Sequence, residues 1–344
     1  FRFYADATPN YLIEYLRMRD LVLSDADMAF LFDHQAGYDN RVRNNLFENL
    51  AFTNNAHAVY LPSDYDVAPG NLFRGCLFHG NRVHSLKWGD GRSAYPVFLE
   101  NCTFYQTSGI AVYGPSSATN CIFCGSGSGV TMFSPDDMQT GDYNCFYMTG
   151  GAVLGALYTR ISGRTGGNGS DAHSLAAEDP LFADAAAGDF HLKSAAGRWT
   201  PAGWTTDSAS SPAIDLGLPS ASFGAEPAPN GGRINAGLYG NTPRASKSPS
   251  GKMLQVLSFN DGGSSSGTIP LAWNSRSFAE DESVRIEFSP DAGSTWSVLA
   301  GQIPAAAGVY SWDSTLQGSA QFCKWRVVAE SGPDCASATR HTFS

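Results

Sequence analysis

The chain has 344 residues, among them 37 glycines and 14 tyrosines, and only 16% of its residues are charged. A chain of this length can bury two cores, and this composition favours an extracellular β-protein over a helical cytosolic enzyme. The formal net charge of −10 excludes a nucleic-acid partner, and no apolar run approaches the roughly 18 to 20 residues that cross a bilayer.

Strand-like sequence begins almost at once, at Tyr11 to Arg19, and the chain opens at Phe1 without an initiator methionine or a leader. We therefore expect the chain to begin inside a larger protein or after processing. The first rung then lacks a cap, which predicts end-to-end self-association or continuation into upstream coils.

A short phrase recurs six times between residues 20 and 147, at intervals of 29, 26, 26, 19 and 24 residues. Its copies are Asp20-Leu-Val-Leu23, Asn49-Leu-Ala-Phe52, Gly75-Cys-Leu-Phe78, Asn101-Cys-Thr-Phe104, Asn120-Cys-Ile-Phe123 and Asn144-Cys-Phe-Tyr147. Each phrase lies between two other short apolar runs, so each unit holds three strands. The phrase opens on Asn or Gly in five of the six copies, and these residues tolerate the bent or left-handed backbone that a corner between two strands needs. The pattern predicts an all-β chain whose larger part is a right-handed parallel β-helix with three strands per rung.

Strand alternation predicts which positions of the phrase face inward. The second and fourth positions form two apolar columns: Leu21, Leu50, Cys76, Cys102, Cys121 and Cys145, and Leu23, Phe52, Phe78, Phe104, Phe123 and Tyr147. The third position faces outward, and its residues are apolar enough that we expect a loop or a partner to cover them. A β-sandwich is the alternative fold, but it does not explain why like residues recur in register.

The cysteines of the inward column are interpreted as small apolar fillers of the core. Cys121 and Cys124 have the spacing of a zinc motif, yet alternation places their thiols on opposite faces. Whether Cys323 and Cys335 form a disulfide stays open.

Four motifs follow in order after residue 178: Asp179-Pro-Leu-Phe182, Gly188-Asp-Phe-His-Leu192, Ser211-Pro-Ala-Ile-Asp-Leu-Gly217 and Asn230 to Thr242. Their succession resembles the closing coils of secreted bacterial right-handed β-helix proteins, the pectate-lyase-like superfamily of surface-anchored type. The resemblance covers roughly residues 100 to 245 and implies closing coils at about 178–245, so that together with the repeat it predicts a β-helix over residues 1–246. It does not imply one activity, since this fold hosts many functions.

A polar linker at residues 247–251 is a predicted boundary, followed by about seven strand-like runs over residues 252–344. That spacing predicts an immunoglobulin-like or fibronectin-III-like sandwich. Ser289 to Trp296 resembles the Asp-box of sialidase-type propellers, which is a structural turn there, and we interpret it as one here.

In many β-helix enzymes the substrate lies along one parallel sheet. A lyase acting on a uronate polymer needs a base and a cation that neutralises the carboxylate. The apolar runs that follow the repeated phrase, and the loops after these runs, offer three sets of candidate residues. The candidates for catalysis are Lys87, His84, His57 and Arg92, and those for stacking on sugars are Tyr60, Tyr65, Trp88 and Tyr113. The candidate calcium ligands are Asp64, Asp66 and Asp90. If the run from His84 to Trp88 has the same register as the later run that contains Ile110 and Val112, the side chain of Lys87 points into the core. A one-residue slip places it outside and buries Leu86 and Trp88, and we prefer that register because an unpaired lysine in the core would be costly.

Two functions remain. The preferred function is an extracellular or cell-surface scaffold without catalytic activity, which is structural, adhesive or glycan-binding. Its expected partner is a polysaccharide or another surface glycan, and calcium is the one cofactor that the sequence suggests. The alternative is a secreted polysaccharide lyase or glycoside hydrolase that acts along the outer face of the β-helix.

Overall fold

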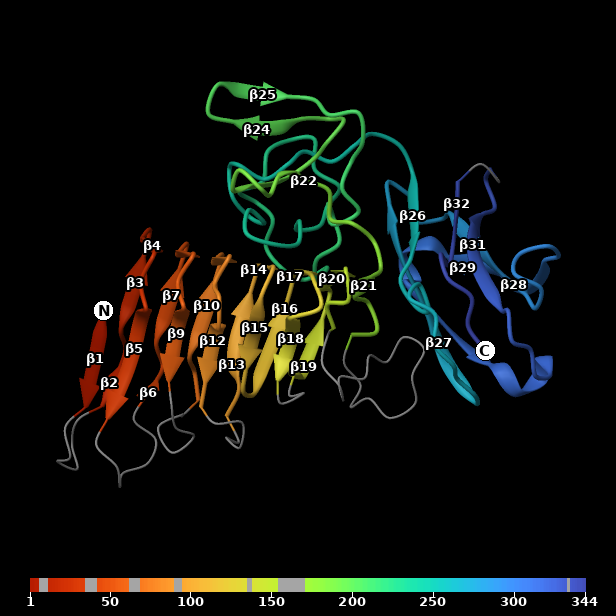
Figure 1. Cartoon of the computed structure of the whole chain (residues 1–344). Coiled ribbons are helices and arrows are strands. Elements are labelled where there is room, and N and C mark those ends of the chain that lie inside the picture. The colour runs from red at the N-terminus through yellow and green to blue at the C-terminus, as the bar shows by residue number, and fades with distance from the viewer. Residues whose placement is uncertain are drawn as a thin grey trace.

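The computed structural model describes residues 1–5, 12–34, 42–61, 69–89, 95–134, 138–153, 171–332 and 335–344. The structure is nearly all β and begins with a right-handed parallel β-helix, as the repeat predicts (Figure 1). Each rung carries one strand in each of three parallel sheets, which we call the first, second and third sheet in the order in which the chain visits them.

The first sheet contains β3 (Arg17–Arg19), β7 (Leu46–Glu48), β10 (Leu72–Arg74), β13 (Val97–Glu100), β16 (Ser116–Thr119) and β19 (Met138–Asp142). The second contains β4 (Val22–Ser24), β8 (Ala51–Thr53), β11 (Leu77–His79), β14 (Thr103–Gln106), β17 (Ile122–Ser126), β20 (Cys145–Thr149) and β21 (Leu175–Ala176). The third contains β1 (Arg2–Ala5), β5 (Met28–His34), β9 (His57–Leu61), β12 (His84–Trp88), β15 (Gly109–Tyr113) and β18 (Val130–Ser134). A further pair, β2 (Ile13–Glu14) and β6 (Val42–Arg43), lies at a corner.

The repeated phrase forms the corner between the first and second sheets and the strand that follows it. Its first residue has a left-handed backbone in five copies, with φ of +59° at Asp20, +54° at Asn49, +60° at Gly75, +50° at Asn101 and +57° at Asn120. Asparagine, aspartate and glycine tolerate this conformation better than other residues. The corner prediction is therefore confirmed for these copies.

Phenylalanine rings stack in register along the inside of the second sheet. Successive ring centroids from Phe52 through Phe78, Phe104 and Phe123 to Phe146 are 5.0, 4.4, 5.1 and 5.4 Å apart. The inward columns are thus confirmed for the first five copies of the phrase.

The sixth copy is shifted by one residue, so two predicted positions were wrong. Phe146, not Tyr147, pairs with Phe123, and Cys145 pairs with the outward Ile122. The left-handed corner residue is Tyr143, with φ of +58°. The sixth copy therefore begins one residue earlier than the Asn-Cys pattern suggested, and Cys145 belongs to the outward row.

Buried asparagines connect the rungs at other corners. Oδ1 of Asn55 accepts a hydrogen bond from the N–H of Ala26 at 3.0 Å. Its Nδ2 donates to the carbonyl of Leu23 at 3.0 Å and to Oδ1 of Asn81 at 3.1 Å. Asn45 and Asn71 form a second ladder, with 2.9 Å between Nδ2 and Oδ1. These amides satisfy backbone groups that the corners leave without strand partners.

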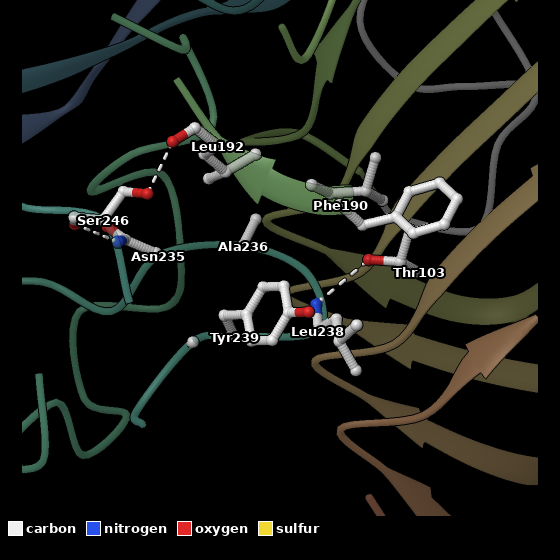
Figure 2. A pocket seen from close by; sticks show the side chains of 10 residues that line it. Thr103, Phe190, Leu192, Asn235, Ala236, Leu238, Tyr239 and Ser246 are labelled. Carbon is white, nitrogen blue, oxygen red and sulfur yellow. Dashed lines mark hydrogen bonds between the residues drawn. The ribbon is translucent and has the colours of Figure 1, made fainter. Parts of the chain in front are cut away.

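Residues 182–246, which we call the cap, fold back over the outward face of the second sheet and add antiparallel hairpins to the molecule (Figure 1). The hairpins pair β22 (Phe182–Asp184) with β23 (Asp189–Leu192), and β24 (Arg198–Thr200) with β25 (Gly203–Thr205). Apolar cap residues such as Phe190, Leu216 and Ala236 pack on Leu77 and Ile122 of the outward row. Figure 2 shows this contact, where the N–H of Leu238 donates to Oγ1 of Thr103 at 3.0 Å. The expectation that a loop covers the outward row is confirmed for this part of the solenoid.

A small β-sandwich follows the cap. One sheet contains β26 (Met253–Val256), β27 (Thr268–Arg276) and β30 (Val309–Asp313); the other contains β28 (Ser283–Ser289), β29 (Ser297–Pro304), β31 (Lys324–Ala329) and β32 (Ala336–Ala338). Two short 3₁₀ helices, η2 (Ala305–Ala307) and η3 (Ser314–Gln317), flank β30. In the Asp-box-like segment, Asp291 accepts hydrogen bonds from Thr295 and Ser289, which confirms a structural turn.

None of the seven cysteines forms a disulfide in the structure, and Cys323 and Cys335 remain thiols. Cys121 lies in the solenoid core, whereas Cys124 lies under the cap, so the two thiols do face opposite sides of the strand. Burial raises the pKa of the Cys76 and Cys121 thiols, which keeps them protonated and unreactive.

Candidate functional site

The outward face of the third sheet carries two rows of side chains. The register of the parallel strands places the equivalent residues of successive rungs side by side. One row contains Met28, His57, His84, Ile110 and Thr131, and the other contains Leu31, Tyr60, Lys87, Tyr113 and Ser134. Two consecutive residues point inward between the rows, for example Ser85 and Leu86 in β12. This break in alternation explains why residues three apart in sequence share the outer face.

His57 and His84 are hydrogen-bonded neighbours on adjacent rungs. Their Nδ1 atoms are 3.1 Å apart, and the ring planes are inclined by 25°. Burial lowers the pKa of His57 against the opposing effect of Asp27. Burial, His57 and Lys87 together lower the pKa of His84 to about 4. Both imidazoles are therefore neutral at pH 7, so that one ring donates the shared proton and the other accepts it.

Lys87 lies between two tyrosines on the neighbouring rungs. Its Nζ is 4.3 Å from the ring centroid of Tyr113 and 5.7 Å from that of Tyr60. Edge-on contacts of 4.8 Å between His57 and Tyr60 and of 5.5 Å between His84 and Tyr113 connect the two rows. These five side chains, His57, Tyr60, His84, Lys87 and Tyr113, form one surface, which we call the histidine–tyrosine cluster.

The cluster contains most of the site residues that the sequence predicts on these strands. Lys87 is on the outer face, whereas Leu86 and Trp88 are buried, which confirms the preferred placement of the lysine. Trp88 is wrong as a sugar-stacking residue, because its fully buried ring packs against Phe32 and Phe73 in the core. The remaining predicted residues, Arg92, Tyr65, Asp64, Asp66 and Asp90, lie outside the described residues.

Within the described ranges no group of three or more His, Cys, Asp or Glu side chains is placed to hold a metal ion. The cluster combines a cation, two neutral imidazoles and two phenol rings. Such a surface can stack on sugar rings, pair with a carboxylate and exchange protons.

A second feature, which sequence reasoning missed, is a cleft of about 1120 Å³ between the cap and the corner of the first and second sheets. Its solenoid side contains Asp20, Val22, Asn49, Ala51, Arg74, Leu77 and Glu100, and its cap side contains Leu218, Leu238, Tyr239, Thr242 and Arg244. The sequence signal for this cleft was the apolar outward row, which indicated that another element covers the second sheet. The row did not show where the covering element ends, and the cleft lies at that boundary.

A sequence model of the family described as "Disaggregatase related" matches residues 125–217. These residues run from the end of β17 into the cap, whereas the histidine–tyrosine cluster lies before them. Comparison with curated proteins and with solved structures finds no match. No helix in the described parts of the chain is long and apolar enough to cross a bilayer. The chain is thus a β-helix protein in which residues 125–217 match this family model.

Proposed function

We propose that this protein is an extracellular or cell-surface scaffold that binds an extended glycan along the outer face of the third sheet. The observation that carries this proposal is the histidine–tyrosine cluster. Its rings project from strands that stand roughly 4.8 Å apart, so that Tyr60 and Tyr113 repeat along the solenoid axis at roughly 10 Å. A regular row of rings suits a ligand that itself repeats.

Two further observations support this proposal. The glycine-rich composition with few charged residues is typical of extracellular β-proteins. The family name "Disaggregatase related" points toward the dispersal of aggregates, and a protein in such a process must contact the material that holds an aggregate together.

A second candidate function is polysaccharide cleavage by elimination, favoured by the neutral imidazole pair beside the Lys87 ammonium. In that reaction an imidazole nitrogen would take the proton alpha to a uronate carboxylate, and Lys87 would neutralise the carboxylate. The glycosidic oxygen would leave with its electron pair and take up a proton, which gives one unsaturated and one reducing end.

One experiment separates the two functions. The protein is incubated with alginate, pectate, ulvan and neutral glycans, with and without calcium, while binding and the formation of unsaturated ends are both measured. For the scaffold we expect binding without new ends, and a several-fold loss of affinity for Tyr113→Ala, since this variant removes an aromatic face on which a sugar ring packs. Thr131→Ala, which lies on the same face outside the cluster, is the control.

If neither Tyr113→Ala nor Lys87→Ala weakens binding relative to Thr131→Ala, the cluster is not the glycan site. Unsaturated ends that disappear in His84→Ala and Lys87→Ala would establish the lyase instead.

We also propose that residues 1–246 and 252–344 act as two domains joined at 247–251, the second an immunoglobulin-like or fibronectin-like accessory module. Separate apolar cores in the solenoid and the sandwich support this division. The linker is held in place, because the carbonyl of Lys247 accepts from Ser194 and the hydroxyl of Ser248 donates to Asp215.

A further inference from the structure

The two arginines of the cleft have different surroundings. Arg74 donates to Glu100 at 2.8 Å and to Glu48 at 3.2 Å, so its charge is balanced by carboxylates. Arg244 lies on the opposite wall, exposed, with its guanidinium carbon 5.5 Å from the ring centroid of Trp199 and 5.4 Å from that of Tyr239. Among the described residues no carboxylate pairs with Arg244.

Two aromatic rings lie near this guanidinium at cation–π distance. Tyr239 is stacked in turn on His191, with ring centroids 3.7 Å apart, and the Nδ1 atom of His191 lies 2.6 Å from Asp189. A guanidinium that faces aromatic rings and no carboxylate keeps N–H groups available that can pair with a planar anion. In a protein with a net charge of −10, such a group favours an anionic ligand locally.

The floor of the cleft is the outward face of the second sheet, from β11 across β8 to β4, the last strand of that sheet. Val22, Ala51 and Leu77 form the outward row there; Val22 is 77% exposed and Leu77 is buried by the cap. Strands β8 and β11 are paired on both sides, so an extended peptide would find no free backbone ladder on them. The part of the floor that β8 and β11 form therefore suits the apolar face of a sugar better than a peptide strand.

The corner residues add polar groups beside this floor. Asp20 and Asn49 repeat at the same corner position on successive rungs, and Nδ2 of Asn49 donates to Oδ1 of Asp20 at 3.3 Å. Both side chains retain further hydrogen-bonding capacity, since a carboxylate accepts several bonds and an amide has two donors. They can accept from and donate to hydroxyl groups.

From this arrangement we infer that the cleft is a second binding site, specific for a segment of an anionic glycan. Arg244 pairs with a carboxylate or sulfate group, Asp20 and Asn49 bond hydroxyl groups, and the sugar faces lie on Val22 and Ala51. The site lies on the second sheet, and it does not depend on the histidine–tyrosine cluster of the third.

The test is isothermal titration of the full chain with oligogalacturonate, a sulfated galactan oligosaccharide, a neutral oligogalactose of the same length, and oligoglutamate. We expect at least one anionic sugar to bind at least tenfold more tightly than the neutral one. Arg244→Gln should weaken that binding at least tenfold, and Ala51→Trp should abolish it by filling the cleft. Whether uronate or sulfate binds more tightly identifies the anionic group.

Two variants serve as controls. Arg82→Gln removes the same charge from an exposed arginine that does not line the cleft, and Thr131→Ala removes a hydroxyl from the third sheet outside the histidine–tyrosine cluster; both should bind as the unaltered protein does. The inference is overturned if no anionic sugar binds, if Arg244→Gln binds with unchanged affinity, or if oligoglutamate binds as tightly with the same dependence on Arg244.

Discussion

His84 is a residue whose protonation is strongly altered by its place in the fold. Its pKa is lowered to about 4 from an ordinary value of 6.5, first by burial and then by His57 and Lys87. Between pH 4 and pH 6.5, His84 is protonated in the unfolded chain and neutral in the folded chain. The free energy of unfolding therefore falls as the pH is lowered from 6.5 toward 4.

We predict that His84→Asn makes the protein less sensitive to acid over this interval. The contribution removed is about 1 kcal/mol, allowing for the solvent that still reaches the half-buried ring. Urea unfolding at several pH values between 4 and 7 measures it, with the exposed His341→Asn as control. Equal acid sensitivity of His84→Asn and the control would contradict the prediction.

Glu226 acts in the opposite direction, because burial raises its pKa to about 7. The folded state therefore takes up this proton first, which stabilises the protein as the pH falls from 7 toward 4.5. Both His84→Asn and its control retain Glu226, so its contribution cancels when the two are compared.

The positions of single side chains were predictable where strand alternation held. The prediction that Lys87 lies on the outer face was correct, because burying its charge in the core would be costly. Trp88 was misplaced as a ligand-stacking residue because aromatic rings suit both a core and a sugar site, and composition alone does not separate the two. That the row of His57 and His84 shares one face with the row of Lys87 depends on the inward pair in each strand, which the sequence pattern does not mark.

At the scale of elements, the repeated phrase was sufficient to predict the strands and corners of the solenoid. The one-residue shift at Tyr143 was not predictable, because the sixth copy has its own Asn-Cys pair one position later. The cap was predicted only as a cover, since its path depends on long-range contacts of irregular segments with the outward row.

Buried asparagine ladders are the elements that we expect to hold successive rungs together. Asn55→Ala would leave the N–H of Ala26 and the carbonyl of Leu23 without partners, at about 1–3 kcal/mol for each buried group. We therefore predict a loss of about 2–4 kcal/mol in the free energy of unfolding, measured by urea denaturation.

The adjacent Asn54 supplies the control. It is exposed and left-handed, with φ of +58°, and the equivalent residue of the next rung is Gly80, with φ of +65°. Asn54→Gly should therefore change stability by less than about 1 kcal/mol. Similar losses for the two variants would show that the corners depend on backbone conformation and not on the amide ladder.

At the scale of the whole molecule, a buried ion pair joins the cap to the sandwich. Arg276 of β27 donates to Asp215 of the cap at 2.8 Å, and the aspartate is completely buried. Its other oxygen accepts from the hydroxyl of Ser248 and the N–H of Gly231. The pair therefore fixes the sandwich to the solenoid through the linker region.

We predict that Arg276→Ala lowers the free energy of unfolding by about 3–5 kcal/mol, because it leaves a buried carboxylate without its cation. The partly exposed pair of Arg43 and Glu14 provides the comparison, and Arg43→Ala should cost at most about 1 kcal/mol. The double variant Asp215→Asn, Arg276→Met should recover most of the loss, since it removes both charges and asparagine tolerates the left-handed backbone of residue 215. Urea unfolding of the three variants measures these differences. If Arg276→Ala is no less stable than Arg43→Ala, the apolar contacts of Leu257 and Ala272 with the cap are what hold the two parts together.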